Sequence, residues 1–442
     1  MTTDLEPATP NALDVPVGMR VVEDLQRSRL TVFFRLALSI PHFVWLSLWT
    51  IVVVLTSIVA GIIVLIRGQL PDGLHRFFTA YIRYSVHVYA FASLAASPFP
   101  GFAGSPGYEI DVEFDPPAPQ NRWKTFFRII LILPALMLAS ALSGGGTSFG
   151  GALFLCGFLI WFVALARARA PEGLSRLQWY CLHYGAQVGA YGLFVTDRYP
   201  TSDPERIGVP WPPPDHPIRL AHAPDDGRRS RLTVFFRLLL VVPHWVWLYI
   251  WGYIAELALV VNWIVTLIAG RSPDFLHRFL GAYVRQQTHV YAYLLLLANP
   301  FPGFVGVPGS YPVDLEIDER EPQNRWKTLF RLFLAIPAFV VLTALVFALF
   351  LVALFGWFVA LFTGRMPDGL RKLGLFGVRY AAQVSAYAYL LTDRYPYAGP
   401  PAGPVHAPVP ADAPVPPGTE GFSADDPRSG WLNSPFGEEK TD

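Results

Sequence analysis

The chain repeats one unit four times, and each copy opens with an arginine, a Phe-Arg pair and a proline. In the first copy these are Arg29, Phe34-Arg35 and Pro41, and a long apolar run follows. The steps from the first arginine to the second, and from there to the proline, are each six residues in every copy. Fixed offsets at a long period indicate a repeat architecture rather than a single irregular core. The other three copies open at Arg122, Arg231 and Arg325.

A second motif, a proline followed by an acid, lies after each apolar run. It begins at Pro71, Pro171, Pro273 and Pro367, and an aromatic segment with basic residues at fixed places follows each time. A proline with an acidic neighbour is typical of a helix start, because the acid complements the helix dipole. In copy one the basic residues Arg76, Arg83 and His87 recur at helical spacing, so one face of the predicted helix over 74–96 should carry all three.

The copies alternate between two types. Copies one and three share Pro-His, a closing histidine and Pro-Phe-Pro-Gly-Phe, whereas copies two and four share Asn-Arg-Trp-Lys-Thr, a closing glutamine and Thr-Asp-Arg-Tyr-Pro. The chain is therefore a duplicated pair of repeats. We place repeat 1 at 27–107, repeat 2 at 108–200, a proline-rich linker at 201–227, repeat 3 at 228–310 and repeat 4 at 311–397.

These motifs resemble the uncharacterised prokaryotic membrane family known as domain of unknown function 4389, present here as tandem copies. The resemblance rests on the Arg-x-x-x-x-Phe-Arg…Pro-His start, the Pro-Asp-Gly-Leu motif at Pro71 and the Thr-Asp-Arg-Tyr-Pro end, and it covers roughly residues 27–396. It implies a membrane protein and assigns no activity, cofactor or catalytic residue.

Composition supports a membrane protein independently of that resemblance. The chain is 53% hydrophobic and 15% charged, whereas soluble domains average about 25% charged residues. The net charge of +1 gives no argument for a nucleic-acid partner. Cys156 and Cys181 lie in apolar context and fit small core residues better than a metal or disulfide site. No signal-peptide pattern occurs in the first 26 residues, so we expect the first apolar helix to be retained.

We predict an all-α integral membrane protein with four repeats of a transmembrane helical hairpin plus an amphipathic interfacial helix. In copy one the hairpin helices would cover 29–49 and 51–67, because Trp49 and its counterparts indicate a far-side interface and turn. Alternating segments at 108–115 and 313–318 predict short extramembrane β-strands between repeats, paired with strands near Val17 and Ile218. The N-terminal 26 residues should be disordered apart from that short strand, and the Pro- and Ala-rich tail 398–442 should be disordered.

Charge placement selects this topology. Arginine and lysine cluster at every repeat start and around every proline–acid motif, and only a hairpin with a non-crossing third helix puts all clusters on one side. The positive-inside rule makes that side the cytoplasm. We therefore expect a multi-pass protein of a bacterial plasma membrane, with eight crossings and both termini cytoplasmic.

Two sets of residues are candidates for binding anionic lipid headgroups or another anion. The first set lies about two turns into each apolar run, where snorkelling to phosphates is the simpler explanation. The second set is the basic stripe after each proline–acid motif, for which a structural ion-pair network is the alternative. The candidates are Arg35, Arg128, Arg237 and Arg331 in the first set, and Arg76, Arg83, His87, Arg176, Arg278, Arg285, His289 and Arg379 in the second.

No catalytic motif, metal-ligand spacing or cofactor fingerprint accompanies these residues. The sequence favours a non-enzymatic membrane protein that organises partners or binds anionic lipid at the cytoplasmic face, with membrane lipids and a membrane protein as its expected partners. A transporter or channel subunit with duplicated halves is the first alternative, with Glu256 and Asn262 as pathway residues. A lipid-modifying enzyme using the His–Arg stripe is the second. The ligand and the oligomeric state stay open.

Overall fold

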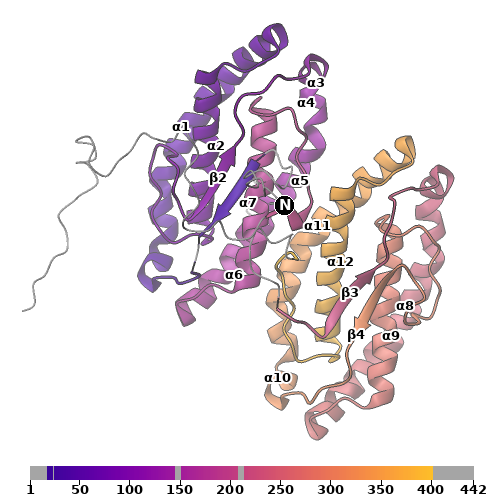
Figure 1. The fold of residues 1–442 in the computed structure, drawn as a ribbon. Coiled ribbons are helices and arrows are strands. Elements are labelled where there is room, and N and C mark those ends of the chain that lie inside the picture. Colours follow the sequence, from indigo (N-terminus) through magenta and orange to yellow (C-terminus); the bar gives the residue numbers. More distant parts are fainter. Residues whose placement is uncertain (1–16, 23, 145–150, 208–213, 402–442) are drawn as a thin grey trace, which may run out of the picture. The chain divides into compact units, whose positions relative to one another are not determined.

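A computed structural model describes residues 17–22, 24–144, 151–207 and 214–401 (Figure 1). We refer to residues 17–207, with repeats 1 and 2, as the first half, and to residues 214–401, with repeats 3 and 4, as the second half. The first half contains β1 (Val17–Val21), α1 (Arg29–Arg67), α2 (Asp72–Ala92), β2 (Ile110–Phe114), α3 (Arg122–Phe126), α4 (Arg128–Leu131), α5 (Leu133–Ser143), α6 (Ala152–Arg167), α7 (Glu172–Gly192) and the 3-10 helix η1 (Pro204–Ile207). The second half contains β3 (Ile218–His222), α8 (Arg231–Ala269), α9 (Asp274–Leu294), β4 (Val313–Ile317), α10 (Arg325–Leu329), α11 (Arg331–Thr363) and α12 (Asp368–Ala388).

Each apolar run of repeats 1, 3 and 4 forms one continuous helix, so the predicted hairpin turn is wrong there. Helices α1 and α8 have 39 residues each and α11 has 33. The residues that suggested a turn serve helix packing instead. Trp49 lies against Phe77 and Tyr81 of α2, and a Cβ on Gly252 would come within 3.0 Å of the Tyr283 hydroxyl. A glycine at a close helix contact does not end a helix by itself. Because these three runs form no hairpin, they do not support the expected eight crossings.

Repeat 2 differs from the other three because its apolar run is interrupted. Helix α5 ends at Gly144, which adopts the left-handed conformation with φ +74°, and α6 begins at Ala152. A glycine with this conformation is typical of a helix end, and residues 145–150 lie outside the described part of the chain. Three helices, α1, α8 and α11, are long and apolar enough to cross a membrane, which supports membrane association.

The second helix of each repeat begins at the proline–acid motif, as the sequence indicates. Pro71 is the N-cap of α2 and Asp72 is its first residue, and α7, α9 and α12 start in the same way. These helices are not the lone interfacial helices that we predicted. Helix α2 lies between α1 on one side and β2 on the other, so the apolar face that would have entered the lipid packs on α1.

The predicted strands form and pair across repeats. Strand β1 pairs antiparallel with β2, with Val17 opposite Phe114, and β3 pairs antiparallel with β4, with Ile218 opposite Ile317. Val15 and Pro16 of the predicted first strand lie outside the described residues. Each half therefore has three layers: long apolar helices, a central pair of helices (α2 and α7, or α9 and α12) and a two-stranded sheet, which lies on the central pair (Figure 1).

The two repeats of each half run in opposite directions. The backbone N–H of Gln120 donates to the carbonyl of Gly68, just past the end of α1. The backbone N–H of Arg27 donates to the carbonyl of Ala168, just past the end of α6. Corresponding bonds join Gln323 to Gly270 and Arg229 to Gly364 in the second half. Each repeat thus starts beside the end of its partner's apolar helix.

Residues 398–401 are a correction to the predicted disordered tail. Ala398 is buried, and the carbonyl of Gly399 accepts a hydrogen bond from Arg379 Nη2. Arg379, near the middle of α12, holds this segment because its guanidinium offers several donors to backbone carbonyls. Residues 402–442, the remainder of the predicted tail, lie outside the described part.

Candidate functional site

The first candidate set lies inside the protein, at the C-terminal ends of the central helices. Arg35, Arg128, Arg237 and Arg331 are each at most 2% exposed. Arg128 Nη1 donates to the carbonyls of Tyr191 and Thr196 at 2.7 and 3.2 Å. Arg237 Nη1 donates to the carbonyl of Tyr293 at 2.6 Å. The last carbonyls of a helix have no partner within it, so these guanidinium groups complete the ends of the central helices rather than snorkelling outward.

An aromatic ring lies beneath each of the four guanidinium groups. The carbon Cζ lies 4.1 Å from the ring centroid of Phe91 for Arg35 and 4.2 Å from that of Tyr387 for Arg331. Arg331 also donates to Asp393 Oδ1 at 2.9 Å, within the Thr-Asp-Arg-Tyr-Pro motif. Cation–π contact and charged hydrogen bonds account for these arginines as structural groups.

The stripe of copy one meets an aspartate that sequence reasoning did not assign to it. Asp111 of β2 lies with its Oδ1 3.0 Å from Arg83 Nε and 3.3 Å from His87 Nε2. Arg83 Nη2 also donates to the carbonyl of Val112 at 3.1 Å. Burial alone would raise the pKa of Asp111, but hydrogen bonds from His87 and two backbone amides, with the charge of Arg83, lower it overall.

Copy three repeats this arrangement. Asp314 Oδ1 of β4 lies 2.8 Å from His289 Nε2 and 3.4 Å from Arg285 Nε. Burial lowers the pKa of His289 and of Arg285, and Asp314 opposes both shifts. We call Arg83, His87 and Asp111, with Arg285, His289 and Asp314, the two Arg–His–Asp clusters. Each cluster fixes a strand pair to a central helix.

In copies two and four the stripe holds the backbone of strands and linkers. His183 Nε2 lies 2.7 Å from the carbonyl oxygen of Val17 in β1, and Gln383 Nε2 donates to the carbonyl of Ile218 in β3. The Gln187 and Gln383 side chains accept from the amides of Thr201 and Tyr397 at 2.9 and 3.0 Å. The His-to-Gln alternation therefore reflects which chain segment each central helix holds.

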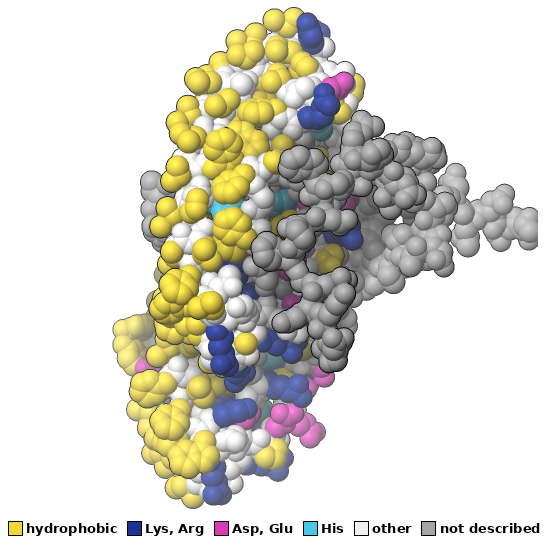
Figure 2. All heavy atoms as spheres, turned by 90° about the vertical axis from the view of Figure 1, so that its left-hand side faces the viewer, with side chains coloured by type: hydrophobic (Ala, Val, Ile, Leu, Met, Phe, Trp, Pro, Cys, Tyr) yellow, Lys and Arg dark blue, Asp and Glu magenta, His cyan; other side chains and the backbone are white. Residues whose placement is uncertain are grey.

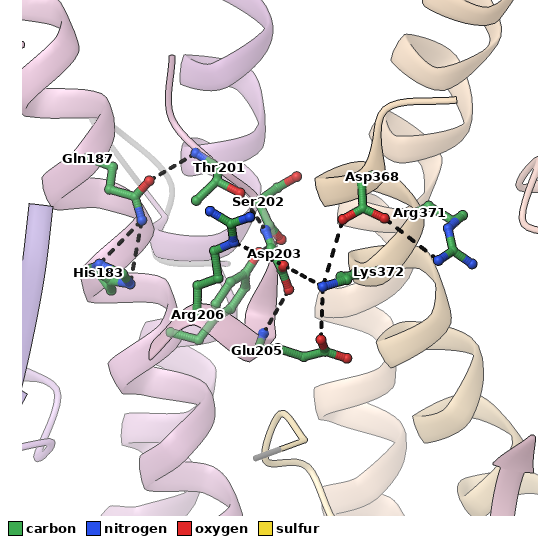
Figure 3. A network of polar contacts seen from close by, with 11 residues as sticks. His183, Gln187, Thr201, Ser202, Asp203, Glu205, Arg206, Asp368, Arg371 and Lys372 are labelled. Carbon is green, nitrogen blue, oxygen red and sulfur yellow. Dashed lines mark hydrogen bonds and ion pairs between the residues drawn. The ribbon is translucent and has the colours of Figure 1, made fainter. Parts of the chain in front are cut away.

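The basic residues one turn into the central helices differ widely in exposure. Arg76 and Arg278 are exposed, and Arg278 pairs with Asp274 at 2.8 Å. Arg176 is 2% exposed and pairs with Glu172 at 2.7 Å. Lys372 of repeat 4 contacts the other half: its Nζ lies 2.9 Å from both Asp203 Oδ2 and Glu205 Oε2 (Figure 3). Of the second set, only Arg76 and Arg278 are open to an external anion.

Charged and apolar side chains lie on different sides of the described protein. Figure 2 shows hydrophobic side chains gathered along one side and most Lys, Arg, Asp and Glu side chains along the other. On the polar side, a shallow hollow of about 1020 Å³ over β3 and β4 is lined by Arg219, Arg285, Asp314 and Glu316. Its charges are mixed and largely paired within the sheet.

The residues proposed for transport lie on different faces of α8. Glu256 is exposed, whereas Asn262 is buried and its Oδ1 accepts from the Ser272 hydroxyl at 2.7 Å. No group of three or more His, Cys, Asp or Glu side chains that could hold a metal occurs among the described residues. Cys156 and Cys181 are buried free cysteines, as the sequence indicates.

Asp111 and Asp314 are the functional residues that the sequence analysis missed, although a signal was present. Each is the first acid inside a strictly alternating strand of the matching copies, 24 or 25 residues after the closing histidine. Strand alternation places acids on one face, and a buried histidine needs a hydrogen-bond partner. Together these two facts could have identified Asp111 as the partner of His87 and Asp314 as the partner of His289.

Comparison with curated proteins and with solved structures found no match. A family comparison matches four tandem segments: residues 29–103, 122–202, 231–305 and 325–398. These segments correspond to the four copies of the helix pair, each with its buried arginine and its proline–acid helix start. Since they make up more than half of the chain, it belongs to the family described as Domain of unknown function (DUF4389).

Proposed function

We propose that this chain is a membrane-bound protein that lies along the cytoplasmic leaflet and binds anionic lipid headgroups there. One observation supports the proposal most strongly: the exposed arc of α1 is apolar along almost its whole length. Helix α11 repeats this, and so does α8 apart from the exposed Glu256. Leu36, Leu55 and Ile66, near the start, middle and end of α1, are 76%, 63% and 68% exposed. An apolar surface of that extent marks a membrane or protein contact.

The length of these helices favours an orientation in the plane of the membrane. At 1.5 Å per residue, the 39 residues of α1 extend about 58 Å, whereas the hydrocarbon core is about 30 Å thick. A helix that is apolar over its whole exposed arc and nearly twice that length would have to tilt steeply to cross. Lying along the leaflet, it buries its apolar arc while its two basic ends stay on one side.

The strand layer gives a second reason for the same orientation. Strands β1 and β2 lie along the central helices α2 and α7, so upright helices would bring Asp111 and the open sheet edges to membrane depth. Lipid-exposed sheet edges do not occur within the hydrocarbon region, because their backbone groups would have no partners. With α1 in the plane, the strands face the aqueous side, where Figure 2 shows the charged side chains.

The short helices α3 and α10 supply the best headgroup contacts. Each begins with an exposed Arg-Trp-Lys segment, in which Trp123 and Trp326 are 75% and 72% exposed. Exposed phenylalanines and aliphatic residues follow directly, at Phe126 and Phe127 in repeat 2. Tryptophan and basic residues beside an apolar segment are typical of the membrane–water interface, so Lys124 and Lys327, with Arg122 and Arg325, are the proposed phosphate contacts.

Cysteine labelling at the two ends of α1 tests the orientation. In a chain with Cys156→Ala and Cys181→Ala, Ser28→Cys and Gln69→Cys place one thiol at either end of α1. An in-plane helix keeps both thiols in the cytoplasm, so an impermeant maleimide should label neither in intact cells and both after permeabilisation. Labelling of one end in intact cells would mean that α1 crosses the membrane, and the proposed orientation would fail.

Lipid analysis tests the headgroup contacts separately. Purified in native lipid, the protein should retain anionic phospholipid, and the double variant Lys124→Ala/Lys327→Ala should retain less. A basic residue near an anionic surface contributes about 1 kcal/mol. The control is Arg371→Ala, whose side chain is largely buried beside Asp368. Equal retention by the double variant and the original chain would rule out these lysines as headgroup ligands.

A further inference from the structure

The apolar surface of the second half contains a groove of about 680 Å³. Its walls are the N-terminal part of α8, with Leu238 and Trp245, and the C-terminal part of α11, with Phe350 and Trp357. The central helices α9 and α12 contribute its floor. Ligand pockets generally measure about 300–1,000 Å³, so the groove is large enough to hold a bound molecule rather than a few waters.

The lining of the groove selects an uncharged, apolar occupant. Most of its side chains are aliphatic or aromatic, and the floor adds the neutral polar groups of Gln287, Tyr291 and Ser385. The single charged residue in the lining is Arg237, whose Nη1 donates to the carbonyls of Tyr293 and Ala298. Its Nε and Nη2 are buried without a hydrogen-bond partner among the described residues, and its Cζ lies 4.3 Å from the ring centroid of Tyr293. Because the guanidinium is buried against the end of α9 and this ring, the open part of the lining is a surface suited to hydrocarbon.

Two substitutions between the halves lie at the groove. In the first half, Gly157 of α6 lies directly on Ser93, the C-cap of α2: a Cβ on Gly157 would come within 2.7 Å of the Ser93 carbonyl oxygen. The matching residues of the second half are Ala353, eleven residues before the C-cap of α11, and Leu295, the C-cap of α9. Both line the groove, and their larger side chains prevent the close approach that Gly157 and Ser93 allow.

We propose that this groove holds one acyl chain of a membrane lipid, taken from the leaflet in which the protein lies. The inference rests on the proposed function, because that orientation puts the mouth of the groove among acyl chains. Chain binding in the groove would be independent of the headgroup, since the one charged side chain of the lining, Arg237, is itself buried at the end of α9. It would give the second half a fixed lipid, distinct from the lipids that merely surround α1.

Photo-crosslinking in nanodiscs tests the groove. The full chain is reconstituted in phosphatidylcholine that contains a small share of phosphatidylcholine with a diazirine in one acyl chain, and the labelled peptides are mapped after irradiation. Label should concentrate on groove residues such as Leu349 and Leu354. Ala353→Phe and, from the floor, Ala381→Phe should each lower that label several-fold. Ala37→Phe, which adds the same bulk to the exposed arc of α1, should leave it unchanged.

The outcomes separate this inference from the proposed function. The label could instead spread along the exposed arcs of α1 and α8 in proportion to exposure and stay unchanged in both groove variants. That result would overturn acyl-chain binding in the groove and leave the proposed membrane orientation intact. A chain that fails to enter nanodiscs, or takes no label on α1 at all, would overturn both. The two filling variants come from different helices, α11 and α12, and each is checked by its elution as a folded species. Misfolding of one variant therefore does not decide the test.

Discussion

At the scale of single residues, His289 couples the stability of the protein to pH. Its ring lies against Tyr311, and Asp314 and Arg285 are its charged neighbours. Burial lowers its pKa in the folded state, whereas an unfolded chain has a histidine pKa of about 6.5. The unfolded state then binds the proton first as the pH falls, so stability is lost below about pH 6.5.

His289→Gln should flatten this loss. Glutamine already stands at the matching positions 187 and 383, and its amide can donate to Asp314 without titrating. Thermal unfolding in detergent, followed from neutral pH down to about pH 5.5, should show a smaller decrease in Tm for the variant. The control His222→Gln changes an exposed histidine of β3 and should keep the original slope. An unchanged slope in His289→Gln would show that other groups account for the pH dependence.

Single residues also show which features of the candidate site could be predicted from the sequence. Fixed offsets identified Arg35, Arg128, Arg237 and Arg331 as one set, but position in an apolar run cannot say which way a side chain points. The direction depends on the carbonyls at the ends of the central helices, more than 55 residues later in the chain. Only the fold brings these donors and acceptors together. Sequence spacing alone therefore could not predict which carbonyls the four arginines bind.

At the scale of elements, one largely buried carboxylate in each half joins the strand layer to the central helices, together with hydrogen bonds to strand carbonyls. Asp314 accepts from His289 and from the Gly309 amide, and it pairs with Arg285. Glu316, two residues on, is 55% exposed and pairs with Arg219, itself 45% exposed. Exposed pairs contribute about 0–1 kcal/mol, whereas removing one partner of a buried charged network costs about 3–5 kcal/mol.

Asp314→Ala should therefore loosen β3 and β4 from α9. Hydrogen exchange should become faster in β3, β4 and residues 303–312, while α8 and α11 keep their protection, because local opening follows local contacts. Glu316→Ala is the matched control on the same strand and should leave exchange nearly unchanged. Equal effects of the two variants would mean that strand pairing, rather than Asp314, holds the layer.

The long apolar helices also show why the predicted hairpin was wrong. A 39-residue apolar run exceeds one crossing, so a hairpin was the natural prediction, and aromatic residues near its middle supported a turn. In the structure Trp49 faces Phe77 and Tyr81, which makes it a packing residue. The strands and the helix starts were predictable because alternation and the proline–acid motif are local signals. The choice between a turn and continuous helix depended on what α2 and α9 present to the long helix.

At the scale of the whole molecule, Lys372 joins the two halves. Asp203, just before η1, is buried, and it accepts from Lys372 Nζ at 2.9 Å, with Arg206 3.4 Å away (Figure 3). Burial alone would lower the pKa of Lys372, but its bonds to Asp203 and Glu205 raise it, so the lysine stays charged. The position is Arg76, Arg176 or Arg278 in the other repeats. Arg176 also reaches the other half, where its Cζ lies 6.0 Å from the ring centroid of Tyr397.

Lys372→Met should destabilise the protein by about 2–3 kcal/mol, because it leaves the buried Asp203 carboxylate with only Arg206 as a charged partner. The counterpart Arg278→Met removes an exposed pair within one helix and should cost at most about 0.5 kcal/mol. Thermal unfolding in detergent compares the two variants, and α5 packed against α11 keeps the halves in contact in both. If Arg278→Met lowers the Tm as much as Lys372→Met does, the contact between the halves adds no stability, and the lysine is simply another helix-start residue. A larger loss for Lys372→Met alone would show that the contact of Lys372 with Asp203 stabilises the association of the two halves.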